Sequence, residues 1–353
     1  MGDELVSKKK KIFPITPALS DYLVTQGRTI KMPIFYDDLL RFSGTMEIYD
    51  DNGQDTLWVN CIYAPQDIEE INQSLKRVYS ILHADGSDSI LPYLTIDSIC
   101  YCTFGNTRPF RVKVRNIIND NYIFLYIKRA DASRIYGLEL EHLLSPNLIN
   151  FLVYRDTLIE EHIIGIPGDV FIEQNLKDLS QQDQRALAKE FVKFNERCFI
   201  RLLADMRSYN YVIVITQDFD RVQYRIRAID FDQQSYEGNS KVYKPQFLKE
   251  NNALVEMTLE VLPRESIDQY IKEERSLLAK RATSESERLF DLMRCMQEDT
   301  LSLPEKVRQL KTDLYDLTKD VNFKKSKRMG HVVQAALDFV IRNYNSENPF
   351  IIR

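Results

Sequence analysis

Residues 202–234 read "LLADMRSYNYVIVITQDFDRVQYRIRAIDFDQQ", and this stretch decides the fold that we expect for the chain. "YVIVIT" at 211–216 and "VQYRIRAI" at 222–229 are runs of the kind that form strands, and turn residues lie between them. The pattern predicts a β-hairpin. A strand rises about 3.3 Å per residue, so the first strand leads roughly 20 Å away and the second strand returns the chain.

Two Asp-Phe-Asp tripeptides lie at opposite ends of this hairpin. Asp218 and Asp220 fall at its tip, where aspartate is a common turn residue. Asp230 follows the returning strand, so we expect it beside Asn210, which precedes the outgoing strand. Asp205 stands five residues before Asn210. The stretch therefore predicts that two carboxylates and one carboxamide converge at the open end of the hairpin.

The residues before this stretch alternate between strand and helix patterns. Three strand-like runs predict a meander: "SICYCTF" at 98–104, "FRVKVRNI" at 110–117 and "YIFLYIKR" at 122–129. A helix is expected over 133–144, with Glu139 on its buried stripe and Glu141 turned away from it. Two further strands are expected within 149–155 and 160–173. A long helix over 181–204 follows, with Ser180 as its N-cap.

The two ends of the chain differ from this central part. Residues 1–97 look like an accessory α+β region, with a strand-like run at 56–64 and an amphipathic helix over 66–84. Beyond Asn252 the sequence has a helical period almost throughout. We therefore expect an α+β fold with three parts, divided after residues 97 and 174.

The order of a long helix, D-x-x-x-x-N, a hairpin and an aspartate resembles the protein-kinase-like phosphotransferase superfamily. The likeness is closer to aminoglycoside phosphotransferase-like or HipA-like kinases than to eukaryotic protein kinases. It implies a two-lobed fold: a five-stranded antiparallel N-lobe sheet with one helix over 98–174, and a mainly helical C-lobe over 175–353. It also implies an enzyme that uses ATP and Mg²⁺.

The resemblance assigns roles to the residues of the hairpin. Asp205 would accept a hydrogen bond from the hydroxyl group that receives the phosphoryl group. Asn210 and Asp230 would hold the magnesium ion, because Mg²⁺ prefers oxygen ligands and ATP phosphates. Asp232 is either an additional metal ligand or a hydrogen-bonded loop carboxylate, and the sequence leaves both interpretations open.

Further roles fall on the expected N-lobe. Lys128 would pair with the ATP phosphates and Glu139 would hold that lysine, since a carboxylate on a buried stripe needs a cation. A solvated, structurally idle glutamate is the alternative. Gly105 is the one glycine available in the expected phosphate loop, beside Asn106, Thr107 and Arg108. Adenine would pack against a hinge at three positions, unless this segment is an ordinary hairpin: Phe171, Ile172 and Glu173.

Departures from the family pattern leave several functions open. The phosphate loop is poor in glycine, Ala204 precedes Asp205 where arginine is usual, and Asp232 replaces the glycine of the family's metal motif. The leading hypothesis is γ-phosphoryl transfer to a hydroxyl on a protein or a small molecule. The alternatives are a catalytically weak kinase-like nucleotide-binding or scaffold protein, an AMP transferase on the same fold, and an unrelated α+β protein.

Composition narrows the partners and the compartment. The formal net charge of −5 gives no general attraction to nucleic acid, and no apolar run is long enough to span a bilayer. We expect no nucleic-acid partner, no membrane and a cytoplasmic location. The five cysteines show no metal-binding spacing and are expected to be reduced core thiols. The charged helices expected over 265–280 and 285–299 are either solvated faces or a docking or dimer surface.

Overall fold

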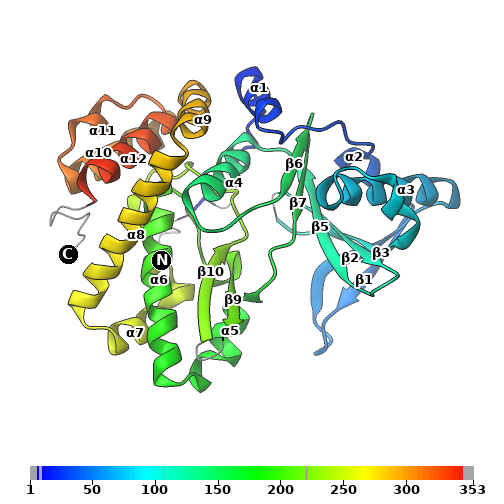
Figure 1. The fold of residues 1–353 in the computed structure, drawn as a ribbon, viewed down its shortest axis with the longest axis horizontal. Coiled ribbons are helices and arrows are strands. Elements are labelled where there is room, and N and C mark those ends of the chain that lie inside the picture. Colours follow the sequence, from blue (N-terminus) through cyan, green and yellow to red (C-terminus); the bar gives the residue numbers. More distant parts are fainter. Residues whose placement is uncertain (1–5, 8–9, 106, 219–221, 345–353) are drawn as a thin grey trace. The chain divides into compact units, whose positions relative to one another are not determined.

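A computed structural model describes residues 6–7, 10–105, 107–218 and 222–344, and it divides the chain into two compact units (Figure 1). The sheet unit consists of Pro14–Asp131 and Ile149–His162. The helical unit consists of Met1–Phe13, Ala132–Leu148 and Ile163–Arg353. Each unit is therefore assembled from stretches that are separated in the sequence.

The sheet unit is built on a seven-stranded antiparallel sheet of order β1-β2-β3-β4-β5-β7-β6. Its strands are β1 Gly44–Tyr49, β2 Asp55–Ile62, β3 Leu94–Cys102, β4 Phe110–Asn116, β5 Tyr122–Arg129, β6 Phe151–Tyr154 and β7 Thr157–Glu161. Its helices are α1 Pro17–Thr25, α2 Tyr36–Leu39, α3 Pro65–His83 and the short 3₁₀ helix η1 Asp88–Tyr93. The predicted meander is confirmed as β3, β4 and β5.

Helix α3 covers one face of this sheet because its apolar residues repeat with the helical period. Ile71, Leu75 and Val78 lie on one side of the helix and are fully buried. They belong to the same hydrophobic cluster as Val112 and Leu125 from β4 and β5. The strands are therefore apolar on the face that α3 covers, and their alternate residues form the other face.

The sequence suggested a separate N-terminal accessory region, but the β1–β2 hairpin belongs to the main sheet instead. Trp58 of β2 pairs with Cys102 of β3, which extends the predicted five-stranded sheet to seven strands. The expected boundary after residue 97 lies inside β3. The glycine-containing turn that suggested a boundary ends α3 instead, since Gly86 N–H donates to the carbonyl of Ser80 at 3.0 Å.

The helical unit contains a small three-stranded sheet of order β10-β9-β8. Its strands are β8 Ile166–Pro167, β9 Tyr211–Gln217 and β10 Val222–Ala228. Its helices are α4 Ala132–Leu144, α5 Gly168–Gln174, α6 Gln181–Arg201, α7 Asn252–Val261, α8 Arg264–Ser284, α9 Ser286–Glu298, α10 Pro304–Thr318, α11 Val321–Lys325 and α12 Met329–Asn343. Short 3₁₀ helices complete it: η2 Leu176–Asp178, η3 Ser208–Asn210, η4 Ser240–Tyr243, η5 Pro245–Phe247 and η6 Lys249–Asn251.

Most of the expected helices of this unit are confirmed. Helix α6 begins after Ser180, whose hydroxyl accepts the N–H of Asp183 as an N-cap. The helical C-terminal part starts at α7, and two prolines mark its interruptions. Pro263 precedes α8 and Pro304 is the first residue of α10.

The strand expected within 160–173 is wrong for most of its length, since only residues 160–161 and 166–167 of this range lie in strands. The chain leaves β7 at Glu161, forms the two-residue strand β8, and then enters helix α5. A short apolar run such as "VFI" fits either type of structure, and here it forms one helical turn with Phe171 buried. Gly168 lets α5 start close to η3, because an added Cβ would lie 2.5 Å from the carbonyl oxygen of Ser208. The expected boundary after residue 174 therefore falls at the end of a helix within the helical unit.

Buried ion pairs connect α4, α6 and α8 in the helical unit. Glu141 of α4 pairs with Arg201 of α6, and both side chains are almost completely buried. Arg197 of α6 pairs with Glu190 at 2.6 Å and with Glu274 of α8 at 3.3 Å. Glu141 was expected to point away from the buried stripe. It is buried because Arg201 supplies a partner for its charge.

We predict that the Glu141–Arg201 pair makes the protein sensitive to acid. Burial alone would raise the pKa of Glu141, but Arg201 and a hydrogen bond from Asn147 outweigh burial and lower this pKa to about 2. A carboxyl with a depressed pKa stabilises the fold above its ordinary pKa, and this contribution is lost as the pH falls from about 4.5 to about 2. The contribution is about 3 kcal/mol at neutral pH.

Urea unfolding of Glu141→Gln and of the parent chain across this pH range tests the prediction. The variant should be less stable at pH 7, and the difference should shrink as the solution becomes more acidic. Glu69→Gln, at an exposed position on α3, serves as the control. A difference that stays constant from pH 7 to pH 3 would contradict the assignment.

None of the five cysteines forms a disulfide, as predicted, and Cys102 alone among them is not fully buried. No helix within the described ranges is long and apolar enough to cross a membrane.

Candidate functional site

The β9–β10 hairpin brings the two ends of the quoted stretch together, as predicted. Tyr211 at the start of β9 pairs with Ala228 at the end of β10. One residue further out, the N–H of Ile229 donates to the carbonyl of Asn210 at 3.0 Å. The loop that carries Asp205 and Asn210 therefore lies beside the loop that carries Asp230. Asp218 follows β9 at the far end of the hairpin, whereas Asp220 lies outside the described residues.

Asp205 is held by hydrogen bonds from its own loop. The side-chain amide of Asn210 donates to the Asp205 carbonyl at 2.7 Å and reaches its Oδ2 at 3.5 Å. Arg207 Nε lies 2.9 Å from Oδ1 of Asp205. That approach is an ion pair but not an aligned hydrogen bond, since neither atom has a hydrogen-bond partner among the described residues. One oxygen of a mostly buried carboxylate is thus left without a donor.

The surroundings of Asp205 favour its protonated form. Burial raises the pKa of this carboxyl, Arg207 lowers it and the charge of Asp230 raises it, and the net result is a pKa of about 7. A carboxyl with a pKa near neutrality can take up a proton at physiological pH and release it again. The electrostatics of the site therefore suit a general base.

The backbone around Asp205 is in an uncommon conformation. Leu202, Asp205 and Ser235 all have positive φ, at 55°, 63° and 52°. Residues other than glycine pay a conformational cost in this region, and such strain is typical of functional sites. Two hydrogen bonds hold the strained segments together: Ser235 N–H donates to the Leu202 carbonyl at 2.8 Å, and Asp205 N–H donates to the Val242 carbonyl at 3.3 Å.

Asp230 and Asp232 share a buried arginine. Nη1 of Arg134, at the start of α4, lies 2.9 Å from Oδ1 of Asp230 and 2.8 Å from Oδ1 of Asp232. The N–H of Asp232 also donates to Oδ1 of Asp230 at 2.9 Å. Arg134 is 1% exposed, whereas the Asp230 side chain is 36% exposed. One guanidinium therefore compensates part of the charge of both carboxylates.

Lys128 and Glu139 each have a charged partner other than the one expected. Lys128 lies on β5 in the sheet unit, and its Nζ is 3.2 Å from Oε2 of Glu160 on β7. Glu139 lies on α4 in the helical unit, and its Oε2 is 2.6 Å from Nη2 of Arg288 on α9. Glu139 is fully buried, as its position on the stripe predicted, and it does have a cation.

The residues of the expected hinge are all described by the structure, whereas the expected phosphate loop is described only in part. Phe171, Ile172 and Glu173 form part of α5, where the carbonyl of Phe171 accepts the N–H of Asn175 at 2.9 Å. The expectation that these three residues form an extended hinge is wrong, because their backbone groups serve the helix. Gly105 has φ of 86°, as a tight turn requires, and Asn106 lies outside the described residues.

The donor set fits a magnesium ion that is held mostly by a nucleotide. The amide nitrogen of Asn210 points at Asp205, so its oxygen is the atom left for a cation, and Asp230 is partly open to solvent. Asp232 is engaged with Arg134 and fits the role of a loop carboxylate better than that of a ligand. In the described chain no group of three or more His, Cys, Asp or Glu side chains is arranged to hold a metal ion.

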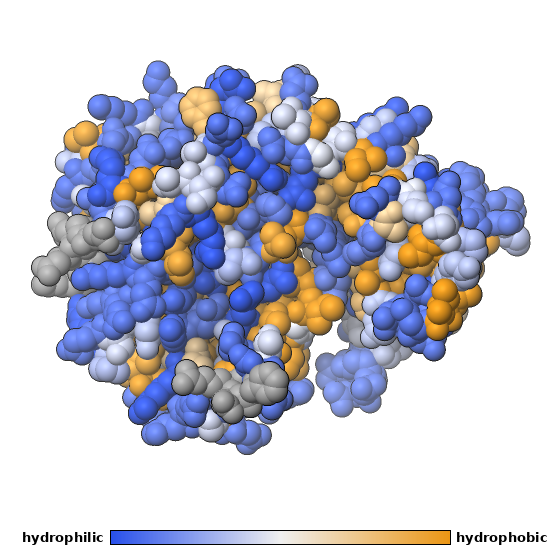
Figure 2. Space-filling view, viewed as in Figure 1, coloured by the Kyte–Doolittle hydropathy of each residue, from blue (hydrophilic) through white to orange (hydrophobic). Residues whose placement is uncertain are grey.

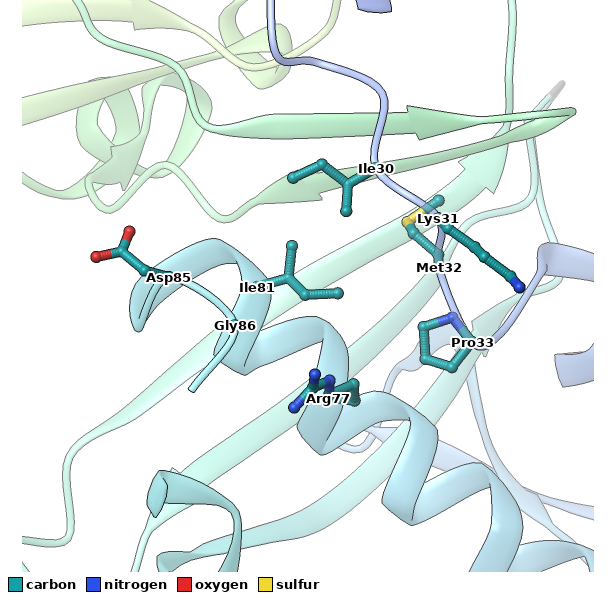
Figure 3. A pocket seen from close by; sticks show the side chains of 8 residues that line it. All are labelled: Ile30, Lys31, Met32, Pro33, Arg77, Ile81, Asp85 and Gly86. Atoms are coloured by element: carbon teal, nitrogen blue, oxygen red, sulfur yellow. The ribbon is translucent and has the colours of Figure 1, made fainter. Parts of the chain in front are cut away.

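A pocket of about 600 Å³ lies in the sheet unit (Figure 3). It is lined by Ile30, Lys31, Met32, Pro33, Arg77, Ile81, Asp85 and Gly86. Figure 3 shows that the segment containing Ile30 and Met32 forms one wall and that α3 forms the other, with Ile81 and Arg77. None of the residues that the sequence singled out lines this pocket.

Two residues of the site were missed by sequence reasoning. Arg134 was missed because 96 residues separate it from Asp230. Its one local signal is that it stands four residues before Leu138 on the buried stripe of α4. Arg207 lies within the D-x-x-x-x-N segment, and its position two residues after Asp205 is a local signal of their ion pair.

No protein-family model matches the sequence, and a search of characterised proteins finds no match.

Proposed function

We propose that the chain transfers the γ-phosphoryl group of ATP to a hydroxyl acceptor in a magnesium-dependent reaction. The observation that carries this proposal is the convergence of Asp205, Asn210 and Asp230 at the open end of one hairpin. It unites a carboxyl whose pKa is near 7 with an amide and a carboxylate that suit a hard cation. A kinase-like fold is part of the same proposal.

Different residues of the helical unit would have different roles in the reaction. Asp205 would orient the acceptor hydroxyl and take its proton as the oxygen bonds to the γ-phosphorus and the bond to the ADP oxygen breaks. Asn210 and Asp230 would hold the magnesium ion, which neutralises phosphate charge when bound. Arg207 would keep Asp205 in place through their ion pair of 2.9 Å.

A second candidate function is nucleotide binding or scaffolding with little turnover. The position of Arg134 favours it, because a guanidinium between Asp230 and Asp232 already supplies one positive charge there. A cation that binds beside it meets a smaller negative charge than two free carboxylates would offer. ATP consumption that requires Asp205 separates the two candidates.

We predict that Asp230→Asn removes the stabilisation of the protein by magnesium and ATP together. The substitution keeps the volume of the side chain and removes the charge that a cation needs. In the parent chain, a ligand at a hundredfold excess over its Kd stabilises the fold by about 2.7 kcal/mol. Thermal melting with ATP, in the presence and absence of Mg²⁺, measures this difference.

The other Asp-Phe-Asp tripeptide offers a matched control. Asp218→Asn makes the same chemical change at the exposed far end of the hairpin and should leave the magnesium-dependent shift intact. If Asp230→Asn melts with the same magnesium-dependent shift as the parent, the assigned metal site is wrong.

The proposal does not specify which compound accepts the phosphoryl group or which partners the chain binds. Figure 2 shows a predominantly hydrophilic surface over the helical unit, which fits a solvated face on its charged helices. Phe290 on α9 is 67% exposed and is the kind of side chain that a docking or dimer surface would use. The acceptor is proposed only as a hydroxyl compound, and a membrane or a nucleic acid has no part in the proposal.

A further inference from the structure

Residues 235–243 form a loop that joins the candidate site to helix α10. On the site side, this loop makes the hydrogen bonds to Leu202 and Asp205 described above. On the other side, Asp313 of α10 accepts the N–H of Ser240 at 3.0 Å. Gly238 lies so close to α10 that an added Cβ would be 2.9 Å from Cα of Lys306. The loop therefore lies between α10 and Asp205.

Glu237 is the charged centre of this loop. Its Oε2 lies 2.8 Å from Nζ of Lys306 on α10, and its side chain is 6% exposed. Its carbonyl accepts the hydroxyl of Tyr243 at 2.6 Å, within the same loop. Loss of the cationic partner would leave the buried carboxylate with an uncompensated charge, which is costly. The ion pair therefore holds the carboxylate and its surroundings in place.

The leading segment of the chain, residues 6–7 and 10–13, completes this arrangement. Ser7 N–H donates to Oε1 of Glu237 at 2.9 Å, and Lys306 donates to the Ser7 hydroxyl at 2.8 Å. The ring of Phe13 lies 6.1 Å from that of Tyr236, which also has Nζ of Lys306 over its face at 3.7 Å. Glu237, Lys306 and Ser7 thus form a closed triad.

We propose that Glu237 is a positioning residue for Asp205 and that the leading segment acts through it. The triad holds loop 235–243 on α10, and the loop in turn holds Leu202 and Asp205 in their left-handed conformations. A strained backbone persists only when its surroundings fix it, and here the fixing contacts come from the loop. The catalytic meaning of this inference rests on the proposed function, whereas the mechanical coupling does not.

Three variants break the triad at different members. Glu237→Gln removes the charge, Lys306→Met removes the cation, and Ser7→Pro removes both hydrogen bonds of Ser7. Each should speed amide hydrogen exchange about tenfold in residues 234–243 and also in residues 202–206, since the two stretches share hydrogen bonds. Each should also lower kcat for ATP consumption by about tenfold and leave KM for ATP unchanged.

The control variant is Arg308→Met, which removes an exposed cation from the same helix two residues away. It should match the parent in both measurements. Faster exchange confined to 234–243, with 202–206 unchanged, would overturn the coupling even if turnover fell. A parent chain that consumes no ATP would overturn the proposed function alone, because the exchange comparison decides the coupling without turnover.

Discussion

Replacing Asp205 with asparagine is expected to lower ATP consumption by about 10³-fold, since positioned acid–base groups contribute roughly 10² to 10⁴. The same substitution is expected to stabilise the protein at alkaline pH. A steady-state ATP assay and urea unfolding at several pH values measure the two effects. Asp316→Asn, at an exposed position on α10, is the control for both.

The sign of the stability change follows from the pKa of Asp205, which burial raises from 3.8 to about 7. Between these pH values the folded chain binds a proton that the unfolded chain has released, so the stability of the parent falls as the pH rises through this interval. Asparagine does not titrate and avoids this loss. A shift of about three units corresponds to about 4 kcal/mol, and the lost ion pair with Arg207 offsets part of it.

We therefore expect Asp205→Asn to be about 2 kcal/mol more stable than the parent at pH 8 and no more stable at pH 4. Full activity in the variant would exclude Asp205 as the base. Equal stability curves for the two chains would show instead that this carboxyl titrates normally.

Replacing Arg134 with methionine is expected to destabilise the protein by about 3 to 5 kcal/mol, the usual cost of removing one partner from a buried ion pair. Arg134 is 1% exposed and contacts Asp230 and Asp232, so the variant leaves two neighbouring carboxylates without this cation. Chemical unfolding measures the loss. Arg294→Met, at an exposed position on α9, should cost little.

The same variant also tests the proposed cation site, because removing a competing positive charge should strengthen Mg²⁺ binding there. Without the guanidinium, Asp230 and Asp232 should attract Mg²⁺ more strongly, so millimolar Mg²⁺ should raise the melting temperature of Arg134→Met more than that of the parent. An equal response of both chains would argue that these carboxylates hold no divalent ion.

The local pattern of the sequence was sufficient for the hairpin and the long helices. Alternating Val and Ile residues in 211–216 favour a strand strongly, and pairing with 222–229 follows from the short connection between them. The convergence of Asp205, Asn210 and Asp230 is a consequence of that pairing. These parts could be predicted because they depend on neighbours in the sequence.

The rest depends on contacts between distant residues. Glu141 was placed on a solvent face because a helical pattern assumes that charges face water, whereas Arg201, 60 residues away, makes burial favourable. The partners Glu160 of Lys128 and Arg288 of Glu139 are likewise set by tertiary packing. Phe171 was assigned to a strand because a short apolar run has no period of its own.

The peptide chain passes from one unit to the other four times, after residues 13, 131, 148 and 162. No single cut can therefore separate the two units completely from each other. A fragment that ends at residue 131 lacks β6 and β7 of its own sheet, and the complementary fragment carries those two strands without the five that they extend. Attempts to express either of these two fragments alone should yield truncated cores. The shortest continuous piece that contains the whole sheet unit is residues 14–162, and it necessarily carries α4 of the helical unit with it.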